Sequence, residues 1–339
     1  MGAHFISHLK SQKYSGRLYM DKTLLQDKAY GALSGLAIGD SFGDASRKPE
    51  NQLSYGITTN FGEEAAWSTD DTEFALLTAT ILLDCKGNLT HDAVVDGWMK
   101  HVVVQEEFPR GGSSEIEAAR NLRKGLRPPQ TGIYNAYAHS DGAAMRIAPI
   151  GIVCAGDPEK ASRLAEIDAS LSHSRDGIWG AQAVAVAVSM AMADAEIFEI
   201  FEEIKKIPPA DSWFAYSLQK TQEIVEKANF EFLDAWMPLH DELWCSYKAA
   251  VPEAVSQAFG VLLLEHKNFR RGVTYAGNFG RDADTIGAIA GAVLGAKYGA
   301  SSIPELWKEK TRYPTGTCLS FTKGIDLKQM SERLVELIG

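Results

Sequence analysis

The sequence predicts an all-α fold, organised as a single compact multi-helix domain. Apolar residues recur at helical spacing along most of the chain, and no convincing run of alternating polar and apolar residues indicates a β-strand. Two segments far apart in the chain each carry glycines at every fourth position, a pattern that favours close helix packing. We expect a polar N-terminal leader over residues 1–20 and one helical domain over residues 21–339.

Composition and charge exclude several classes of protein. The chain has 339 residues, of which 45% are hydrophobic, and this is enough to build a large core. The net charge of −10 argues against binding to nucleic acid or to an anionic membrane, because both need a basic surface. Residues 1–20 lack the continuous apolar core of a signal peptide, so we expect a cytoplasmic protein. Its four cysteines form no CxxC pair, and we expect free thiols.

The first expected helix spans residues 21–43 and carries one of the two glycine series. The series are Gly31, Gly35, Gly39 and Gly43 near the start of the chain, and Gly287, Gly291, Gly295 and Gly299 near its end. Each glycine weakens a helix by about 1 kcal/mol relative to alanine, so we predict that these two helices pack against each other in the centre of the fold. Asp40 ends an apolar run, where a buried carboxylate needs an ion-pair or hydrogen-bond partner.

Two short stretches place acidic and hydroxyl side chains directly before apolar helices. They are Ser68, Thr69, Asp70, Asp71 and Thr72 in the first, and Asp282, Asp284 and Thr285 in the second. Adjacent carboxylates repel each other, and hard oxygen ligands crowded on a short loop are what Mg²⁺, Mn²⁺ or Ca²⁺ require. The alternative is helix capping, with Thr69 as an N-cap, because Asp and Thr accept hydrogen bonds from free backbone N–H groups. The residues alone leave both interpretations open.

The middle of the chain contains further candidates for binding residues. Residues 108–115 form a glycine-containing turn before a helix over residues 116–124, which is either a phosphate cradle or a plain loop. Arg146 lies in a buried helix over residues 140–156, where it serves either a structural ion pair or an anion contact. His173 precedes a strongly apolar helix and is, on composition alone, a capping or surface residue.

The remaining segments complete the helical prediction. Residues 125–137 are expected to be a loop, because they contain prolines and a glycine, and residues 208–213 to be a connection. Helices are expected over residues 90–105, 157–169, 217–229, 230–247, 252–266, 269–277 and 325–338.

Several motifs, taken in this order, resemble those of the ADP-ribosylglycohydrolase family, the group of the dinitrogenase reductase-activating glycohydrolase. They are GALSGLAIGDSFGD, STDDT, SDGAAMRIAP, LSH, VPEAVSQAF and DADTIGAIAGAVLGAKYG, and the match covers roughly residues 24–300. The resemblance implies an all-α single domain with a binuclear Mg²⁺ or Mn²⁺ centre. It also implies hydrolysis of the N- or O-glycosidic bond that joins ADP-ribose to a modified side chain or to a small aglycone.

The resemblance also implies a role for particular residues. The metal ligands would be Thr69, Asp70, Asp71, Asp282, Asp284 and Thr285. The substrate would lie against Gly111, Gly112, Ser113, Ser140, Asp141, Gly142 and His173, with Arg146 and Arg281 as further candidates for substrate contacts. Asp70, Asp71 and Asp44 are the candidates for handling protons during catalysis.

Two positions depart from the family pattern. Where the family usually carries a glutamate shortly after the first Gly-Asp pair, this chain has Arg47, and Asp44 and Glu50 are the nearby acids that would substitute for it. Where the family usually has a glycine before the last acidic pair, this chain has Arg281. Two added positive charges predict an altered substrate, with a phosphate or carboxylate group.

Three hypotheses about function follow. The leading one is a metal-dependent hydrolase that removes ADP-ribose from a modified protein or an ADP-ribose conjugate. The second has the same chemistry on a small N- or O-riboside or a ribose phosphate. The third is a non-catalytic relative, either an ADP-ribose-binding or a crystallin-like structural protein.

Overall fold

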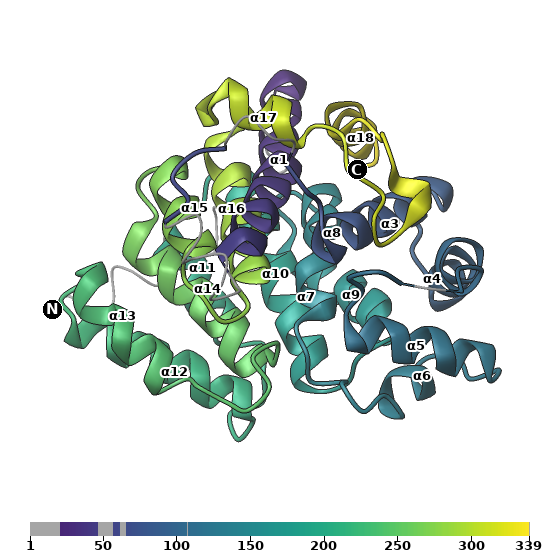
Figure 1. The fold of residues 1–339 in the computed structure, drawn as a ribbon, viewed down its shortest axis with the longest axis horizontal. Helices are drawn as coiled ribbons and strands as arrows, with labels where there is room; N and C mark the ends of the chain where they lie inside the picture. Colours follow the sequence, from purple (N-terminus) through teal and green to yellow (C-terminus); the bar gives the residue numbers. More distant parts are fainter. Residues whose placement is uncertain (1–20, 47–56, 62–65, 107, 339) are drawn as a thin grey trace, which may run out of the picture.

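The computed structural model describes residues 21–46, 57–61, 66–106 and 108–338, and it confirms the all-α prediction (Figure 1). Within these ranges there is no β-strand, and the one isolated antiparallel bridge joins Ser140 and Ala250. The predicted leader over residues 1–20 lies outside the described residues. None of the described helices is long and apolar enough to cross a membrane.

The helices follow one another along the chain with short connections. They are α1 (Lys22–Ser46), α3 (Asp70–Asp84), α4 (His91–Trp98), α5 (Ser113–Arg123), α6 (Gln130–Ile133), α7 (Gly142–Arg146), α8 (Ala148–Val153), α9 (Pro158–Ala169), α10 (Asp176–Met192), α11 (Ile197–Ile204), α12 (Trp213–Lys227), α13 (Phe232–Asp241), α14 (Val251–Glu265), α15 (Phe269–Gly277), α16 (Ala283–Tyr298), α17 (Glu305–Thr311) and α18 (Leu327–Val335). A π-helical turn (Met99–Val103) extends α4, and two short 3₁₀ turns, Ala300–Ser302 and Ser320–Thr322, lie near the C-terminus.

The two glycine-rich helices, α1 and α16, lie side by side at the centre of the molecule, as predicted. Helices α11 to α15 lie on one side of this pair, and α3 to α9 lie on the other (Figure 1). A Cβ atom added to Gly35 would overlap the carbonyl group of Gly291, and one added to Gly39 would overlap that of Gly287. The two backbones therefore approach so closely that the glycines are needed for space rather than for flexibility.

A buried lysine closes one end of the central helix pair. The ammonium group of Lys28 on α1 donates to the carbonyl oxygens of Ala191 at 3.2 Å, Ala296 at 3.1 Å and Lys297 at 2.9 Å. These carbonyls belong to the last turns of α10 and α16, where helix ends have unsatisfied acceptors and favour a positive charge. Asp194 completes the coordination with an ion pair at 2.8 Å.

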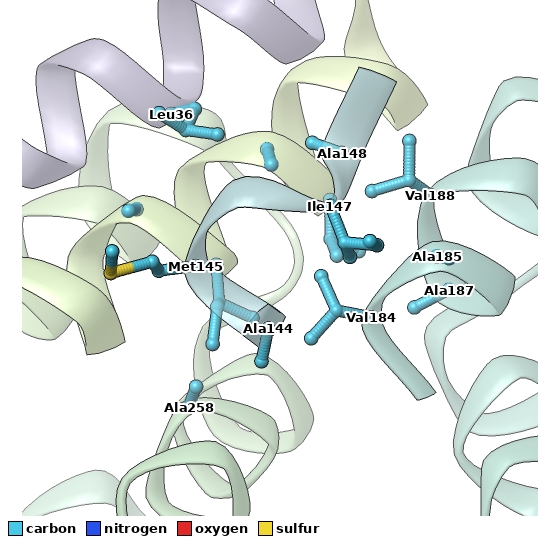
Figure 2. Close-up of a cluster of buried hydrophobic side chains, with 14 of the residues drawn as sticks. Leu36, Ala144, Met145, Ile147, Ala148, Val184, Ala185, Ala187, Val188 and Ala258 are labelled. Atoms are coloured by element: carbon cyan, nitrogen blue, oxygen red, sulfur yellow. The ribbon is translucent and has the colours of Figure 1, made fainter. Parts of the chain in front are cut away.

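The core around the central pair is built mainly from small aliphatic side chains. Figure 2 shows part of it, with side chains from α1, α7, α8, α10 and α14 and from Ile147, which joins α7 to α8. The labelled residues are Leu36, Ala144, Met145, Ile147, Ala148, Val184, Ala185, Ala187, Val188 and Ala258. All ten of these residues are buried, with Met145 the most exposed at 4%. Alanine and valine allow helices to approach closely, so the core extends the tight packing that the glycines begin.

Some element boundaries differ from the sequence-based prediction. The buried segment over residues 140–156 is two helices, because Pro149 lacks an N–H group and so fits the first turn of α8 but not the middle of a continuous helix. The segment predicted to be helical over residues 230–247 ends at Asp241, after an internal proline, Pro238. The predicted loop over residues 125–137 contains the short helix α6.

Candidate metal centre and active site

The N-terminal ends of α3 and α16 bring three acidic side chains together. Asp70, Asp71 and Asp284 each offer a carboxylate oxygen, and these oxygens lie within 4.8 Å of one another. The three side chains are almost fully buried, with exposures of 7%, 1% and 1%. Thr285 follows on the first turn of α16 and is also buried. The two acidic stretches of the sequence, more than 200 residues apart, thus form one cluster.

Asp40 of α1 fixes the start of α3 and so positions its acids. The Asp40 carboxylate accepts hydrogen bonds from the Thr69 backbone N–H at 3.0 Å, the Thr69 hydroxyl at 2.6 Å and the Thr72 hydroxyl at 2.5 Å. Burial is the largest influence on this group and raises the pKa of Asp40 to about 6, against the lowering effect of these donors. The partner that the sequence required for Asp40 is therefore the first turn of α3.

The structure separates the two interpretations of the acidic stretches. Thr69 does cap α3, since its hydroxyl accepts from the Asp71 N–H at 3.4 Å. Asp282 occupies the N-cap position of α16, but its side chain makes no capping hydrogen bond within the described part of the chain. Instead, one Asp282 oxygen forms an ion pair with Lys248 at 2.9 Å. Capping therefore accounts for Thr69, whereas the Asp282 carboxylate forms an ion pair instead of a cap.

The electrostatics of the cluster favour a bound cation. Burial, followed by the charges of Asp284, Asp40, Asp70 and Asp282, raises the pKa of Asp71 well above its usual range. The Oδ1 atom of Asp71 is buried and has no hydrogen-bond partner among the described residues. A buried carboxylate oxygen without a partner is costly unless a proton or a metal ion meets it. Carboxylate and hydroxyl oxygens crowded at one point are a donor set that suits Mg²⁺ or Mn²⁺.

Asp141 directly precedes α7 and is buried. Its N–H donates to the carbonyl of Ala249 at 2.8 Å, and the side chain is 3% exposed. Burial and then the neighbouring charge of Asp282 raise the pKa of Asp141 well above its usual range. The charges of Asp282, Asp71 and Asp284 act on the Asp141 carboxyl, and its role as a substrate contact stays a prediction.

His173 and Ser140, the residue before Asp141, form a buried hydrogen-bonded pair. The Nε2 atom of His173 lies 2.9 Å from the Ser140 hydroxyl, and its Nδ1 atom lies 2.7 Å from the Ser172 hydroxyl. His173 is only 1% exposed, and burial lowers its pKa well below the usual value, so the ring is neutral near pH 7. The structure therefore places His173 as a support for Ser140, next to Gly142 at the start of α7.

Arg146 belongs to a buried ion-pair network. Its guanidinium group contacts Glu115 at 3.1 Å, Asp168 at 2.9 Å and the Ser172 hydroxyl at 2.9 Å. The arginine and both acids are buried, with side-chain exposures of 0% to 1%. Because these donors are directed at protein acceptors, the geometry favours the structural ion pair over the anion contact as the role of Arg146.

The loop before α5 forms another wall of the site. Gly112 occupies the N-cap position of α5, and a Cβ atom there would lie 3.1 Å from the Oδ2 atom of Asp70. Gly111 faces the C-terminal segment, since its Cβ would lie 3.4 Å from the Cys318 sulfur. Ser113 begins the helix and is exposed. The loop over residues 111–113 therefore borders the acidic cluster at Gly112. Its contact with the substrate, which the resemblance implied, stays a prediction.

Glu73 holds the C-terminal segment beside this loop. Its buried carboxylate accepts from the backbone N–H groups of Thr317 at 2.9 Å, Cys318 at 2.9 Å and Leu319 at 2.7 Å. The hydroxyl of Ser68 donates to the same carboxylate at 2.6 Å. One turn of α3 thus carries the cluster acids and also anchors the segment that packs next to them.

The sequence indicates Arg281 as an added positive charge near the substrate, and in the structure this charge is paired with an acid of the protein. Its guanidinium group bonds both oxygens of the buried Glu253 and the carbonyl of Cys245, at 2.7 Å for the latter, and lies over the ring of Trp244. The backbone of Arg281 has φ of 57°, a conformation that glycine adopts more readily. This explains why the family pattern has a glycine at this position, and the ion pair offsets the strain here.

The remaining charged candidates are the residues at and near the family glutamate position. Asp44 forms an ion pair with Arg110. Arg47 and Glu50 lie outside the described residues. Asp44 remains a candidate for proton handling on sequence grounds only.

Sequence reasoning missed Lys248 and Tyr247, which lie on the connection between α13 and α14. Burial, followed by the charges of Asp141, Glu115 and Asp282, raises the pKa of Tyr247, which places its phenol beside the acids. The signal available in the sequence was a tyrosine and a lysine shortly before the VPEAVSQAF motif. Tyr247 is the last residue of a predicted helix and Lys248 follows it directly, and no motif in the sequence marks either side chain as part of the site.

Comparison with known proteins identifies the family. The ADP-ribosylglycohydrolase family model matches residues 21–339, so the chain belongs to the ADP-ribosylglycohydrolase family, and it is a hydrolase of the glycosidase class. The chain is 27% identical to the ADP-ribosylarginine hydrolase Tri1 of Pseudomonas putida, over 85% of this chain and 75% of that protein. It is 24% identical to the ADP-ribosyl-[dinitrogen reductase] glycohydrolase of Rhodospirillum rubrum, over 84% of this chain and 90% of that protein.

A solved structure has the same fold. It is described as an ADP-ribosylglycohydrolase-related protein complex, and it superposes with a TM-score of 0.63 over 94% of this chain and 100% of the other. The two sequences are 22% identical, so this likeness concerns the fold. It agrees with the all-α prediction and with the assignment to the family.

Proposed function

We propose that this protein is a metal-dependent hydrolase that cleaves the glycosidic bond of ribose and releases ADP-ribose from a modified protein or an ADP-ribose conjugate. The observation that carries the proposal is the buried cluster of Asp70, Asp71 and Asp284, in a chain that belongs to the ADP-ribosylglycohydrolase family. A purely structural protein gains nothing from three buried carboxylates crowded at one point, because like charges repel each other. The non-catalytic hypothesis is therefore the weaker one.

The residues that would hold two divalent cations are Thr69, Asp70, Asp71, Asp282, Asp284 and Thr285. When bound, Mg²⁺ or Mn²⁺ would orient the ribose hydroxyls and lower the pKa of a water molecule. The chain itself supplies a rigid frame, because Asp40 fixes the first turn of α3 and the glycine series fixes α16 against α1. Such a frame holds reacting groups in place without further ordering when the substrate binds.

The walls of the cluster suit a ribose with phosphate groups attached. The loop over residues 111–113 leads into α5, whose first N–H groups are available to an anion. On another wall, Ser140 is held by His173, and Asp141 reaches the cluster beside Gly142. Burial excludes water from the acids, which strengthens every electrostatic contact that a bound substrate makes there.

Protons in the reaction would be handled by carboxylates. Glycoside hydrolysis through an oxocarbenium-like transition state requires one group that accepts a proton from water and one that protonates the leaving group. Asp70 and Asp71 lie in the cluster and are candidates for the first task. Asp44, held by Arg110, is the remaining candidate from the sequence.

The test is hydrolysis of defined substrates with and without chelator. Purified protein is incubated with arginine-linked ADP-ribosyl protein, serine-linked ADP-ribosyl peptide and a neutral p-nitrophenyl riboside, and free ADP-ribose or nitrophenol is measured. We expect release of ADP-ribose that requires Mg²⁺ or Mn²⁺ and stops on chelation. Cleavage of the neutral riboside alone would transfer the assignment to the small-riboside hydrolase. Absence of turnover on all three substrates in the presence of both metals would contradict the proposal.

A further inference from the structure

A loop near the C-terminus is closed at its base and lies against the start of α3. Residues 312–326 form this C-terminal loop, which Figure 1 shows beside α3 and just before α18. The guanidinium group of Arg312 bonds both carboxylate oxygens of Asp326, at 3.0 Å and 2.6 Å, and the Leu327 N–H donates to the Arg312 carbonyl at 3.1 Å. Compact surface loops whose ends are joined are frequently functional. The C-terminal loop is therefore a candidate for a role at the site.

Glu73 attaches the C-terminal loop to the helix that carries two of the cluster acids. Its side chain is fully buried. Its Oε1 atom accepts from the Thr317 N–H at 2.9 Å and from the Ser68 hydroxyl at 2.6 Å. Its Oε2 atom accepts from the N–H groups of the next two residues of the loop, at 2.9 Å and 2.7 Å. A glutamine has only one acceptor oxygen, so Glu73→Gln would leave at least two of these donors facing an NH₂ group.

The C-terminal loop also supports the connection between the π-helical turn and α5. Gln105, near the start of that connection, donates to the Cys318 carbonyl at 2.9 Å and accepts from the Ser320 N–H at 2.9 Å. Near its end, a Cβ atom on Gly111 would lie 3.4 Å from the Cys318 sulfur. Both parts of the connection therefore rest on the same short stretch of the C-terminal loop.

These contacts form a closed ring around one side of the site. Gly111 is followed by Gly112, whose Cβ atom would lie 3.1 Å from the Oδ2 atom of Asp70. Asp70 and Glu73 share the first turn of α3. The ring therefore runs from Glu73 through Cys318 and Gly111 back to Asp70. A closed ring of packed contacts fixes the relative positions of its members, which is what a binding site requires of its walls.

We propose that Glu73 is a positioning residue of the site: through the C-terminal loop, it holds the loop before α5 in the position that binds the phosphate groups of the substrate. The inference rests on the proposed function, in which the first N–H groups of α5 are the donors to those phosphates. Both oxygens of Glu73 accept from protein donors, so its effect on the reaction is indirect. Its loss should therefore change substrate affinity rather than the chemical step.

The direct test is ADP-ribose affinity, measured apart from turnover. Wild type and Glu73→Gln are loaded with Mn²⁺, ADP-ribose is titrated calorimetrically, and bound metal is counted by elemental analysis. We expect ADP-ribose affinity to fall at least about tenfold with Mn²⁺ content unchanged, because buried donors without acceptors displace the loop before α5. For an ADP-ribosyl peptide, KM should rise at least about tenfold while kcat stays within about threefold, as expected when uniform binding is lost.

The matched control is Glu265→Gln, the same change at another buried glutamate. Glu265 ends α14 and forms an ion pair with Arg271. The carbonyl of the next residue, His266, accepts from the Tyr298 hydroxyl at 2.6 Å, at the end of α16 that is remote from Asp284. The ADP-ribose affinity of this variant should stay within about twofold of wild type, because distant sites act independently.

A second variant keeps the proposal testable if Glu73→Gln does not fold. Thr315→Val preserves the shape of a half-buried side chain and removes the hydroxyl that lies 2.8 Å from the Ser68 hydroxyl. Because Glu73 keeps its backbone donors, the effect should be smaller. We expect ADP-ribose affinity to fall about threefold.

The thiol of Cys318 provides a readout that needs no substrate. It is 1% exposed, so it reacts only when the C-terminal loop opens. Alkylation by iodoacetamide is followed by mass spectrometry of the peptides, with Cys154, which is 2% exposed, as the internal reference. We expect Cys318 to react at least about tenfold faster in Glu73→Gln than in wild type, and Cys154 to react at the same rate in both.

Unchanged ADP-ribose affinity in Glu73→Gln, or unchanged alkylation of Cys318, would overturn the proposal. Loss of Mn²⁺ from the variant would also overturn it, because Glu73 would then support the metal ligands instead. The proposed function fails in a different way: a wild type that binds no ADP-ribose would refute it, and the role in phosphate binding with it. Unchanged affinity and alkylation in a variant of a wild type that does bind ADP-ribose would refute the role of Glu73 alone.

Discussion

Two buried groups of charges lie near each other in this molecule, and they differ in how the charges are balanced. In the network of Glu115, Arg146 and Asp168, the arginine contacts both acids at 3.1 Å and 2.9 Å. In the cluster around Asp71 and Asp284, the described part of the chain contributes one lysine, bonded to Asp282 at its edge. The first group is balanced within the protein, whereas in the second the Oδ1 atom of Asp71 has no hydrogen-bond partner among the described residues, and we propose that a cation binds there. This difference separates a structural site from a functional one.

The comparison predicts that removing one acid from the cluster affects function rather than folding. For Asp284→Asn we expect kcat to fall at least about 1000-fold, which corresponds to about 4 kcal/mol, together with loss of bound metal. Helix α16 should still form, because asparagine also suits a helix start. Kinetics, elemental analysis and circular dichroism on one preparation test this. Full metal content in the variant would show that the cluster is not the metal centre.

Breaking the balanced network should have the opposite consequence. Arg146→Met leaves Glu115 and Asp168 buried without their cation, and we expect a loss of about 3 kcal/mol in the free energy of unfolding. Metal content per folded chain should not change. Denaturant unfolding measures the loss, and Arg163→Met, at an exposed position on α9, is the control with an expected change below about 0.5 kcal/mol. Equal stability of the two variants would mean that the buried network contributes nothing to folding.

His173, which is hydrogen-bonded next to the Arg146 network, should make the stability of the protein depend on pH. Burial lowers the pKa of His173 in the folded state, whereas an unfolded histidine titrates near pH 6.5. Below that pH the unfolded chain binds a proton that the folded chain does not, so His173 lowers stability as the pH falls, by up to about 1.4 kcal/mol per pH unit. This contribution is absent in His173→Gln. The difference in unfolding free energy between wild type and variant should therefore change between pH 7.5 and 5.5, and parallel pH curves would refute a neutral buried histidine.

The smallest effect is expected at Arg281, whose charge is already balanced by Glu253. Arg281→Gly relieves the backbone conformation but removes the side-chain contacts to the Cys245 carbonyl and the Trp244 ring on the connection before α14. We expect the metals to be retained and the ratio of kcat/KM between protein-linked and small ADP-ribosyl substrates to change by less than about tenfold. Rates on a substrate panel before and after the change provide the measurement. An identical preference in both proteins would show that this connection plays no part in choosing the substrate.

The sequence was informative where a repeated pattern has a single physical cause. Glycines at every fourth position in two helices have few explanations other than close backbone contact, and α1 and α16 are packed in that way. Likewise, a carboxylate at the end of a buried run must find donors, and Asp40 finds them in Thr69 and Thr72. The prediction of two acidic stretches that converge depended on the family resemblance, because neither stretch specifies its partner.

Sequence patterns did not identify which side chains of different helices contact each other. Periodicity shows which face of a helix is buried, but it does not say which acid on another helix meets a given arginine. For this reason Arg146 remained an open choice until Glu115 and Asp168 were seen beside it. For the same reason, Arg281 was interpreted as an added positive charge near the substrate. Its partner Glu253 appears in the sequence as an ordinary acid in the first turn of α14. The position of Lys248 depended on a helix boundary, which is the least certain part of such a prediction.

The measurement that tests the central claim most directly is metal content and ADP-ribose binding on one sample, by elemental analysis and calorimetry with and without chelator. The account predicts close to two divalent ions per chain and ADP-ribose binding that disappears when the ions are removed. A chain without divalent ions that still binds ADP-ribose would contradict it, because the buried carboxylates would then have no cation to balance them.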